Sequence, residues 1–219
     1  MVDFSKIEKK IGYVFKNKKL LQTAITHTSY ANEHKTDSFE RLEFLGDSIL
    51  GFVVAKNLYH IFPEKDEGQL SKIRASLVCE DSLSTIARNL DIPSYILLGV
   101  GEEKSGGRRK NSIISDVVEA ILAAIFLDSG IDEAKAFVDR IIPQKSYKND
   151  KNKDYKSYLQ ETFKHSTISY STRAEKKDGS EIFFSQVYID GKVSGEGNGL
   201  SKKSAEQIAA ETALLNNQR

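Results

Sequence analysis

Apolar residues recur at helical spacing from the N-terminus to about residue 142, and this periodicity most constrains the fold. The segments 20–25 and 42–53 both place Leu, Ile, Ala, Phe or Val three and four residues apart, as one face of a helix requires. Strand-like alternation is scarce in this part of the chain. Residues that end helices follow the apolar runs, at Pro63, Pro93 and Gly130. We therefore expect an all-helical domain over residues 1–145.

The composition changes after Pro143. Residues 144–153 contain no aliphatic side chain, and we expect a flexible linker at 146–153. The remainder, 154–219, predicts a helix, three strands and a second helix, at 155–164, 168–176, 182–189, 192–196 and 201–216. Asp190-Gly191 is a two-residue hairpin signal between the last two strands. The chain thus reads as multi-domain, with an all-α part followed by an α+β part.

Charge and cysteine content exclude several classes of protein. The 32 basic and 31 acidic side chains give a net charge of +1, which excludes a strongly basic tail protein but not a local nucleic-acid patch. The single cysteine, Cys79, excludes a disulfide scaffold and a cysteine-based zinc site. No apolar run approaches a membrane span, and residues 1–10 lack the apolar region of a signal peptide. We expect a soluble, cytoplasmic protein with no membrane partner.

Two apolar helices carry carboxylates on one face. In the first, Glu40, Glu43 and Asp47 fall at i, i+3 and i+7. The residues after Asp47 are largely apolar, so a carboxylate buried there without a partner would be costly. In the second, Asp116 and Glu119 fall at i and i+3. If the two helices pack, four or five carboxylates converge.

Such a cluster cannot stay fully ionised without a counter-charge. Apart from Arg41, no basic residue is interleaved with the acidic positions of these helices. Ligands that are all oxygens point to Mg²⁺ or Mn²⁺ rather than zinc. The alternative is that the acids form a solvated polar face or structural salt bridges.

Residues Glu40–Ser48 read ERLEFLGDS, which resembles the signature of bacterial ribonuclease III. Further segments resemble that family in the same order along nearly the whole chain: Leu21–Tyr30 (LQTAITHTSY), Glu67–Val78 (EGQLSKIRASLV) and Gly106–Asp128. The resemblance implies a homodimeric, Mg²⁺-dependent endonuclease that cuts double-stranded RNA. It also implies 5′-phosphate and 3′-hydroxyl ends with short 3′ overhangs, and roles in processing ribosomal RNA precursors and messages.

The resemblance implies that Glu43, Asp47, Asp116 and Glu119 hold catalytic Mg²⁺, with Mn²⁺ as a substitute and no small-molecule cofactor. Asp47 and Glu119 would be the indispensable catalytic pair, and Glu40 an auxiliary acid. Two metal ions can hydrolyse a phosphodiester without a side-chain nucleophile, which suits this inventory.

Three further positions bear on the resemblance. Phe44 would pack into the partner subunit of a homodimer, and the alternative is that it is ordinary core. Ser115 and Ala123 stand where the family often has Ala and Gly, and neither departure removes a ligand.

Residues 154–219 resemble a double-stranded RNA-binding domain, most strongly over Gly195–Gln207 (GEGNGLSKKSAEQ). Ser201 is a plausible helix N-cap, and Lys202 and Lys203 open that helix. Lysines beside free backbone N–H groups make an anion site, which suits a phosphate backbone.

By resemblance, Gln160 and Glu161 face the minor groove of the RNA. The alternative is that they and the lysines are ordinary solvated surface. The loop at 177–181 reads KDGSE and lacks the Gly-Pro-x-His found in many members, so we expect weaker contact there.

Three questions remain open at this level. The basic residues Lys104, Arg108, Arg109 and Lys110 flank two glycines, and they form either a phosphate site or a solvated loop. The chain could also be a double-stranded RNA-binding protein without catalysis. A third possibility is a helical, metal-dependent phosphohydrolase for small molecules, against which the C-terminal module argues.

Overall fold

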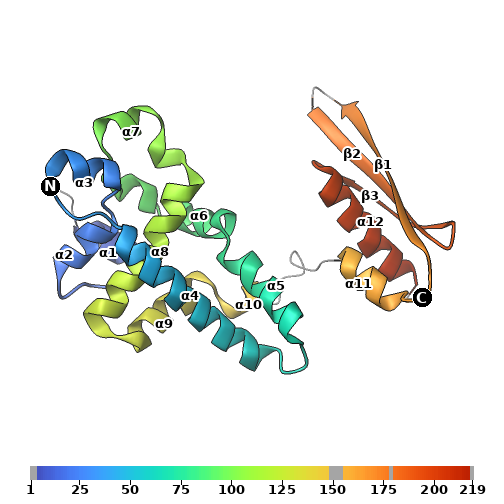
Figure 1. The fold of residues 1–219 in the computed structure, drawn as a ribbon, viewed down its shortest axis with the longest axis horizontal. Coiled ribbons are helices and arrows are strands. Elements are labelled where there is room, and N and C mark those ends of the chain that lie inside the picture. The colour runs from blue at the N-terminus through green and yellow to red at the C-terminus, as the bar shows by residue number, and fades with distance from the viewer. Residues whose placement is uncertain (1–3, 148–154, 178–179, 218–219) are drawn as a thin grey trace. The chain divides into compact units, whose positions relative to one another are not determined.

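The computed structural model describes residues 4–147, 155–177 and 180–217 (Figure 1). The chain divides into two compact units, Met1–Asn149 and Asp150–Arg219. Over the described residues, no helix is long and apolar enough to cross a membrane.

The first unit is helical, as its apolar periodicity predicts. Its α-helices are α1 (Phe4–Ile11), α2 (Lys18–Ala24), α3 (Thr28–His34), α4 (Glu40–Ile61), α5 (Glu67–Val78), α6 (Glu80–Asn89), α7 (Val100–Lys104), α8 (Asn111–Ser129), α9 (Ile131–Ile141) and α10 (Gln144–Tyr147). Two short 3₁₀ turns, η1 (Ile92–Tyr95) and η2 (Gly107–Arg109), complete the described part.

Helix α8 is the centre of this unit and contacts α2, α4, α6 and α9 (Figure 1). Its middle, from Val117 to Ile125, is buried apart from Glu119. The helix ends where Gly130 adopts a φ of 85°, a left-handed conformation that glycine reaches without strain. The long helix α4 buries residues three and four apart along the face that meets α8: Leu42, Gly46, Ile49, Leu50, Val53, Val54 and Leu58.

The segment expected as a linker begins later than the sequence suggests. Ser146 and Tyr147 belong to α10, and Tyr147 is only 4% exposed. Asn57 of α4 donates from Nδ2 to the Tyr147 hydroxyl at 3.1 Å and to Asp139 of α9 at 2.8 Å. The aromatic ring of Tyr147 packs into the apolar core of the first unit, which the polar residues of the expected linker would not do. Residues 148–153 of the expected linker lie outside the described residues.

The second unit has the expected α-β-β-β-α order. Helix α11 (Tyr155–Thr162) precedes an antiparallel sheet in the order β1 (Ile168–Lys177), β2 (Ser180–Ile189) and β3 (Lys192–Gly199), and α12 (Lys202–Asn216) follows. Both helices lie on the same side of the sheet (Figure 1). Asp190 and Gly191 have φ of 49° and 77°, the left-handed pair that a tight hairpin needs.

Three alternate glycines of β3 let α12 lie directly on the sheet. A Cβ at Gly195 or Gly197 would come within 2.3 or 2.4 Å of the α12 backbone at Ala209, and one at Gly199 within 2.7 Å of Ala205. Side chains at these points would separate the helix from the sheet. The glycines and the alanines therefore act together to set this close packing, and the N-terminal end of α12 is placed with them.

Candidate active site

Helices α4 and α8 touch backbone to backbone at Gly46. A Cβ built on Gly46 would lie 1.9 Å from the carbonyl oxygen of Glu119, far inside any real contact distance. Only glycine fits there, so the two helix backbones are in direct contact where they cross. The crossing point is flanked by Asp47 on α4 and by the Glu119 side chain on α8. The sequence pattern placed acids on both helices, and this contact brings them together.

The electrostatics of Glu119 show how closely the acids gather. Its pKa is raised from the ordinary 4.5 to about 8, mainly because burial penalises the charged form. The negative charges of Asp47, Asp116 and Glu43 raise it further, in that order. Glu119 is thus a carboxyl group that keeps its proton at neutral pH unless a positive charge arrives.

The pKa values of two neighbouring acids, Glu43 and Asp116, are also raised. Burial raises the pKa of Glu43, and the charges of Asp116, Glu40 and Asp47 add to the effect. Burial also raises the pKa of Asp116, although its hydrogen bond with the Ser115 hydroxyl opposes the change. Like charges are therefore crowded across the two helices. Glu40 lies at the exposed edge of the group, where its carboxylate accepts a hydrogen bond from Ser38 Oγ at 3.1 Å.

Two residues near Asp116 were not singled out from the sequence. Glu80, the first residue of α6, raises the pKa of Asp116 by its charge, and His27 lowers it. His27 precedes α3 and caps it, since its Nδ1 accepts the Ser29 N–H at 3.1 Å. The only sequence signal was position: each lies in or next to a segment that resembles the family, but neither follows the acidic spacing of α4 and α8.

The donor set suits a divalent cation in its chemistry. It consists of carboxylate oxygens, the preferred ligands of Mg²⁺ and Mn²⁺, and their crowded charge favours a cation. Among the described residues, however, no group of three or more His, Cys, Asp and Glu side chains is arranged so that it could hold a metal ion as it stands. The backbone contact at Gly46 gathers the acids of the two helices.

The RNA-binding positions expected in the second unit share one property, exposure: Gln160, Glu161, Ser201, Lys202 and Lys203. Ser201 is the N-cap of α12, and its hydroxyl accepts the Ser204 N–H at 3.2 Å. The ammonium group of Lys202 lies 4.0 Å from the carboxylate of Glu206, one turn along α12. Asp178 and Gly179, the centre of the divergent loop, lie outside the described residues.

Comparison with known proteins decides the family. Residues 17–146 match the family described as Ribonuclease-III-like, and residues 155–217 match the double-stranded RNA binding motif. The chain is 47% identical over 210 residues to Ribonuclease 3 of Borreliella afzelii, covering 91% of this chain and 85% of the relative. Ribonuclease 3 of Enterococcus faecalis is 43% identical over 221 residues, covering 96% and 95%.

The chain belongs to the ribonuclease III family. It is therefore an endoribonuclease, and the resemblance carried by residues 40–48 is confirmed. The nuclease domain of ribonuclease III from Campylobacter jejuni superposes with a TM-score of 0.61 at 44% identity, covering 68% of this chain and 98% of that one. That structure matches the helical unit in both fold and sequence.

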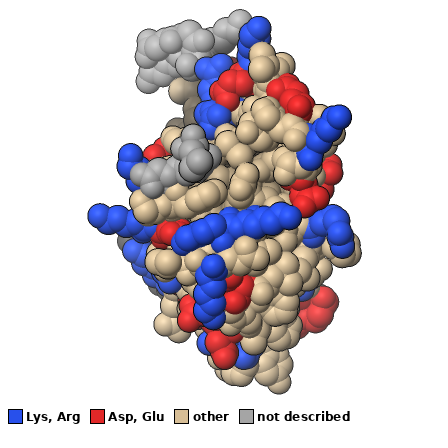
Figure 2. Space-filling view, turned by 90° about the vertical axis from the view of Figure 1, so that its left-hand side faces the viewer, with Lys and Arg blue, Asp and Glu red and all other residues tan. Residues whose placement is uncertain are grey.

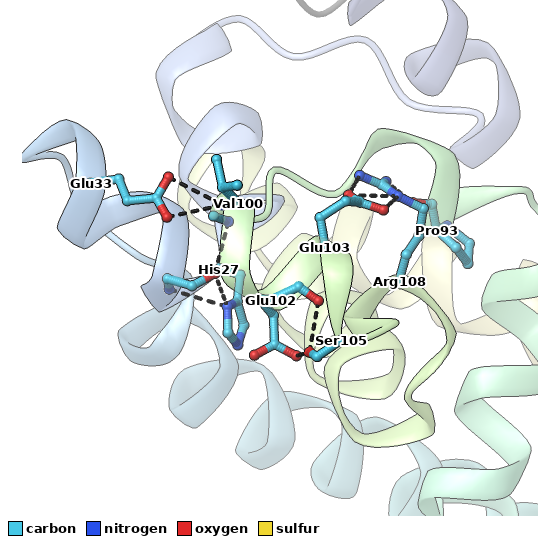
Figure 3. Close-up of polar contacts among 10 residues, drawn as sticks. His27, Glu33, Pro93, Val100, Glu102, Glu103, Ser105 and Arg108 are labelled. Atoms are coloured by element: carbon cyan, nitrogen blue, oxygen red, sulfur yellow. Dashed lines mark hydrogen bonds and ion pairs between the residues drawn. The ribbon is translucent and has the colours of Figure 1, made fainter.

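Part of the basic loop of this ribonuclease III makes internal contacts (Figure 3). Arg108 pairs with Glu103 at 2.5 Å and also donates to the Pro93 carbonyl. Lys110 pairs with Glu102 at 2.7 Å. Two of the four loop cations are therefore already neutralised by neighbouring acids, which disfavours the phosphate-site interpretation of the loop.

Basic and acidic side chains also lie close together outside this loop. Figure 2 shows one face of the molecule, on which Lys and Arg side chains are interspersed with Asp and Glu. A surface of that kind gives no single-sign field to attract a polyanion. On the face shown, the charges are therefore mixed rather than gathered into one basic patch.

Phe44 lies on α4 between Glu43 and the Gly46 crossing and is 79% exposed. It therefore does not belong to the core of its own chain, which removes the alternative considered from the sequence. A large aromatic ring left in water beside an acidic site is a natural contact for another surface.

Proposed function

We propose that this ribonuclease III hydrolyses both strands of double-stranded RNA in a Mg²⁺-dependent reaction, with Mn²⁺ able to replace Mg²⁺. The products would carry 5′-phosphate and 3′-hydroxyl ends with short 3′ overhangs. The natural substrates would be ribosomal RNA precursors and structured messages in the cytoplasm. Residues 1–145 would carry the chemistry, 154–219 would hold the RNA, and no small-molecule cofactor would be needed.

The crowding of acids around Glu119, where α4 meets α8, is the observation that carries this proposal. A carboxyl group with a pKa of about 8, among three acidic neighbours, lacks the positive charge that would complete the site. Asp47 and Glu119 would act as the catalytic pair, with Glu43 and Asp116 as the remaining ligands and Glu40 as an auxiliary acid.

When bound, Mg²⁺ supplies Lewis acidity toward the phosphodiester. The protein's own part is to position the site. The Gly46 contact holds the acids of α4 against those of α8, and Glu119 would hold the cation in its ionised, carboxylate form.

We propose a homodimer with one site for each RNA strand. Exposed Phe44 supports this assignment, as does the related nuclease domain from Campylobacter jejuni, whose description refers to a region involved in dimer formation. A two-fold axis suits a two-stranded substrate, because each strand then meets an equivalent acidic cluster.

The RNA-binding unit would contact the duplex through both of its helices. Gln160 and Glu161 would reach the minor groove, where ribose 2′-hydroxyls are displayed. Lys202 and Lys203 would meet phosphates at the start of α12, with Ser201 closing the helix end.

The proposal is tested by incubating the purified protein with end-labelled duplex RNA, single-stranded RNA and duplex DNA, each with Mg²⁺ and with EDTA. We expect Mg²⁺-dependent cuts in duplex RNA alone, staggered between the strands, with ends as stated above. Tight binding of duplex RNA without cleavage under any divalent metal would favour the non-catalytic RNA-binding function. Turnover of small phosphate esters in place of RNA would favour the phosphohydrolase.

A further inference from the structure

Glu206 is a buried charged residue of the second unit to which the proposed function gives no role. It lies in α12, one turn after the exposed lysines, and its side chain is 11% exposed. Three elements meet at its carboxylate. Lys156 of α11 pairs with it at 2.6 Å, Thr172 of β1 donates to it at 3.2 Å, and Lys202 of α12 lies 4.0 Å away.

The partners of Glu206 are themselves held in place. The ammonium of Lys156 lies 4.6 Å from the ring centre of Tyr170 on β1, a cation–π contact. The backbone N–H of Lys156 donates to Gln207 Oε1 of α12 at 3.3 Å. The hydroxyl of Thr172 also bonds that of Ser185 on β2 at 2.9 Å. One network thus ties the first turn of α11 to α12 and to the sheet.

The network joins the two helices that carry the proposed RNA contacts. Gln160 lies four residues after Lys156 on α11, and Lys202 lies four residues before Glu206 on α12. Residues four apart share one face of a helix. Glu206 and Lys156 therefore fix the relation between the two contact surfaces without needing to touch RNA themselves.

We propose that Glu206 is a positioning residue for double-stranded RNA, which holds α11 and α12 in the relative orientation that lets both meet one duplex. This inference rests on the proposed function. The ligand is the RNA duplex that the proposed function assigns to this unit. The inference adds that Glu206 sets the affinity of the unit for that duplex.

Whether removing the Glu206 carboxylate tightens or weakens RNA binding distinguishes a positioning role from simple charge repulsion. A carboxylate beside phosphate-binding lysines repels RNA, so by charge alone its removal should tighten binding. A positioning role predicts the opposite. Without the carboxylate, the ammonium of Lys156 loses its ion-pair partner, and α11 keeps only the Gln207 hydrogen bond and apolar packing as ties to α12.

The test compares full-length Glu206→Gln with wild type. Duplex-RNA affinity is measured in EDTA, and cleavage is measured in Mg²⁺. We expect affinity to fall about tenfold and KM to rise by a similar factor, with kcat at saturating RNA unchanged. Glu211→Gln, which removes the same charge from the same helix outside the network, should leave both affinity and KM at the wild-type values.

A second variant guards against a simple folding defect. Thr172→Val keeps the shape and every charge but removes the hydrogen bonds of Thr172 to Glu206 and Ser185, and we expect affinity to fall about threefold. Thermal melts establish that each variant is folded at the assay temperature.

Equal or tighter binding by folded Glu206→Gln overturns the proposal, as does a fall in kcat that matches the rise in KM. If Glu206→Gln is unfolded, unchanged affinity of Thr172→Val overturns it instead. Wild-type protein that fails to bind duplex RNA would overturn the proposed function itself, so the two failures remain distinct.

Discussion

Glu119 lies on the central helix of the first unit and Glu206 on the helix that covers the sheet of the second, and their surroundings are opposite. Glu119 faces Asp47, Asp116 and Glu43, and its pKa rises to about 8. Glu206 is paired with Lys156 at 2.6 Å. A buried acid with its counter-charge already supplied by the chain organises structure. A buried acid among like charges is incomplete, and it indicates that a cation is to come from outside.

The largest expected effect is the loss of RNA cleavage when an acid of the cluster around Glu119 is removed. Asp47→Ala or Glu119→Ala should lower the rate of duplex-RNA cleavage by at least about 10³-fold, because the proposed function makes each of them a ligand of the cation. RNA affinity and dimerisation should stay near wild type, as measured by binding in EDTA and by light scattering. Glu133→Ala, an exposed acid on α9, is the matched control. Normal cleavage by either cluster variant would contradict the site assignment.

The next effect separates the two helices without touching a charge. Gly46→Ala would force a Cβ to within 1.9 Å of the Glu119 carbonyl, so α4 and α8 must move apart. We expect the helical unit to lose about 3 kcal/mol or more of its free energy of unfolding, and cleavage to fall with it.

Gly51→Ala on the same helix is the control, since nothing lies within 4 Å of its added Cβ. It should stabilise the unit by about 0.5–1 kcal/mol, as alanine does in a helix. Denaturant unfolding distinguishes the two variants. Equal stability of Gly46→Ala and Gly51→Ala would mean that the crossing is not constrained as described.

A smaller effect on RNA cleavage is expected from the two lysines at the start of α12, which are positively charged, unlike the acidic cluster of α4 and α8. Lys202→Ala combined with Lys203→Ala should weaken duplex-RNA binding while leaving saturated cleavage nearly intact. The slope of log affinity against log salt should fall by roughly 2, one unit for each lost phosphate contact. Unchanged affinity would mean that the helical unit holds the RNA by itself.

The sequence predicts those features that depend on local pattern. Apolar spacing located α4 and α8, Asp190-Gly191 marked the hairpin, and Ser201 was the expected N-cap. These are short-range effects, in which the turn, cap or helix face is decided by neighbours in the chain. The order of elements in the second unit and the helical class of the first followed from them.

Features that depend on distant partners could not be read in this way. Nothing in the sequence of α4 says that Gly46 meets the backbone of Glu119, because that requires knowing which helix lies opposite. The charges of Glu80 and His27 reach Asp116 from other elements. The basic loop had two open interpretations until Arg108 was found paired with Glu103. Only tertiary structure reveals which charges are already matched.

The smallest expected effect is the pH dependence of the stability of the metal-free protein, which arises from Glu119. The folded chain holds the Glu119 proton up to about pH 8, whereas the unfolded chain releases it near the ordinary value of 4.5. Between these values the folded state binds more protons, so metal-free stability should fall as the pH rises. In EDTA we expect a lower Tm at pH 8 than at pH 5.5, by an amount on the order of 5 °C.

Glu119→Gln should flatten this dependence, because the amide does not titrate. Saturating Mg²⁺ should reduce it as well, since a bound cation keeps the carboxylate charged and raises the Tm most at high pH. Other groups titrate over the same range, so the measured quantity is the difference between wild type and variant. Identical pH curves for the two proteins would mean that Glu119 is not crowded as its neighbours imply, and the contrast with the paired Glu206 would disappear.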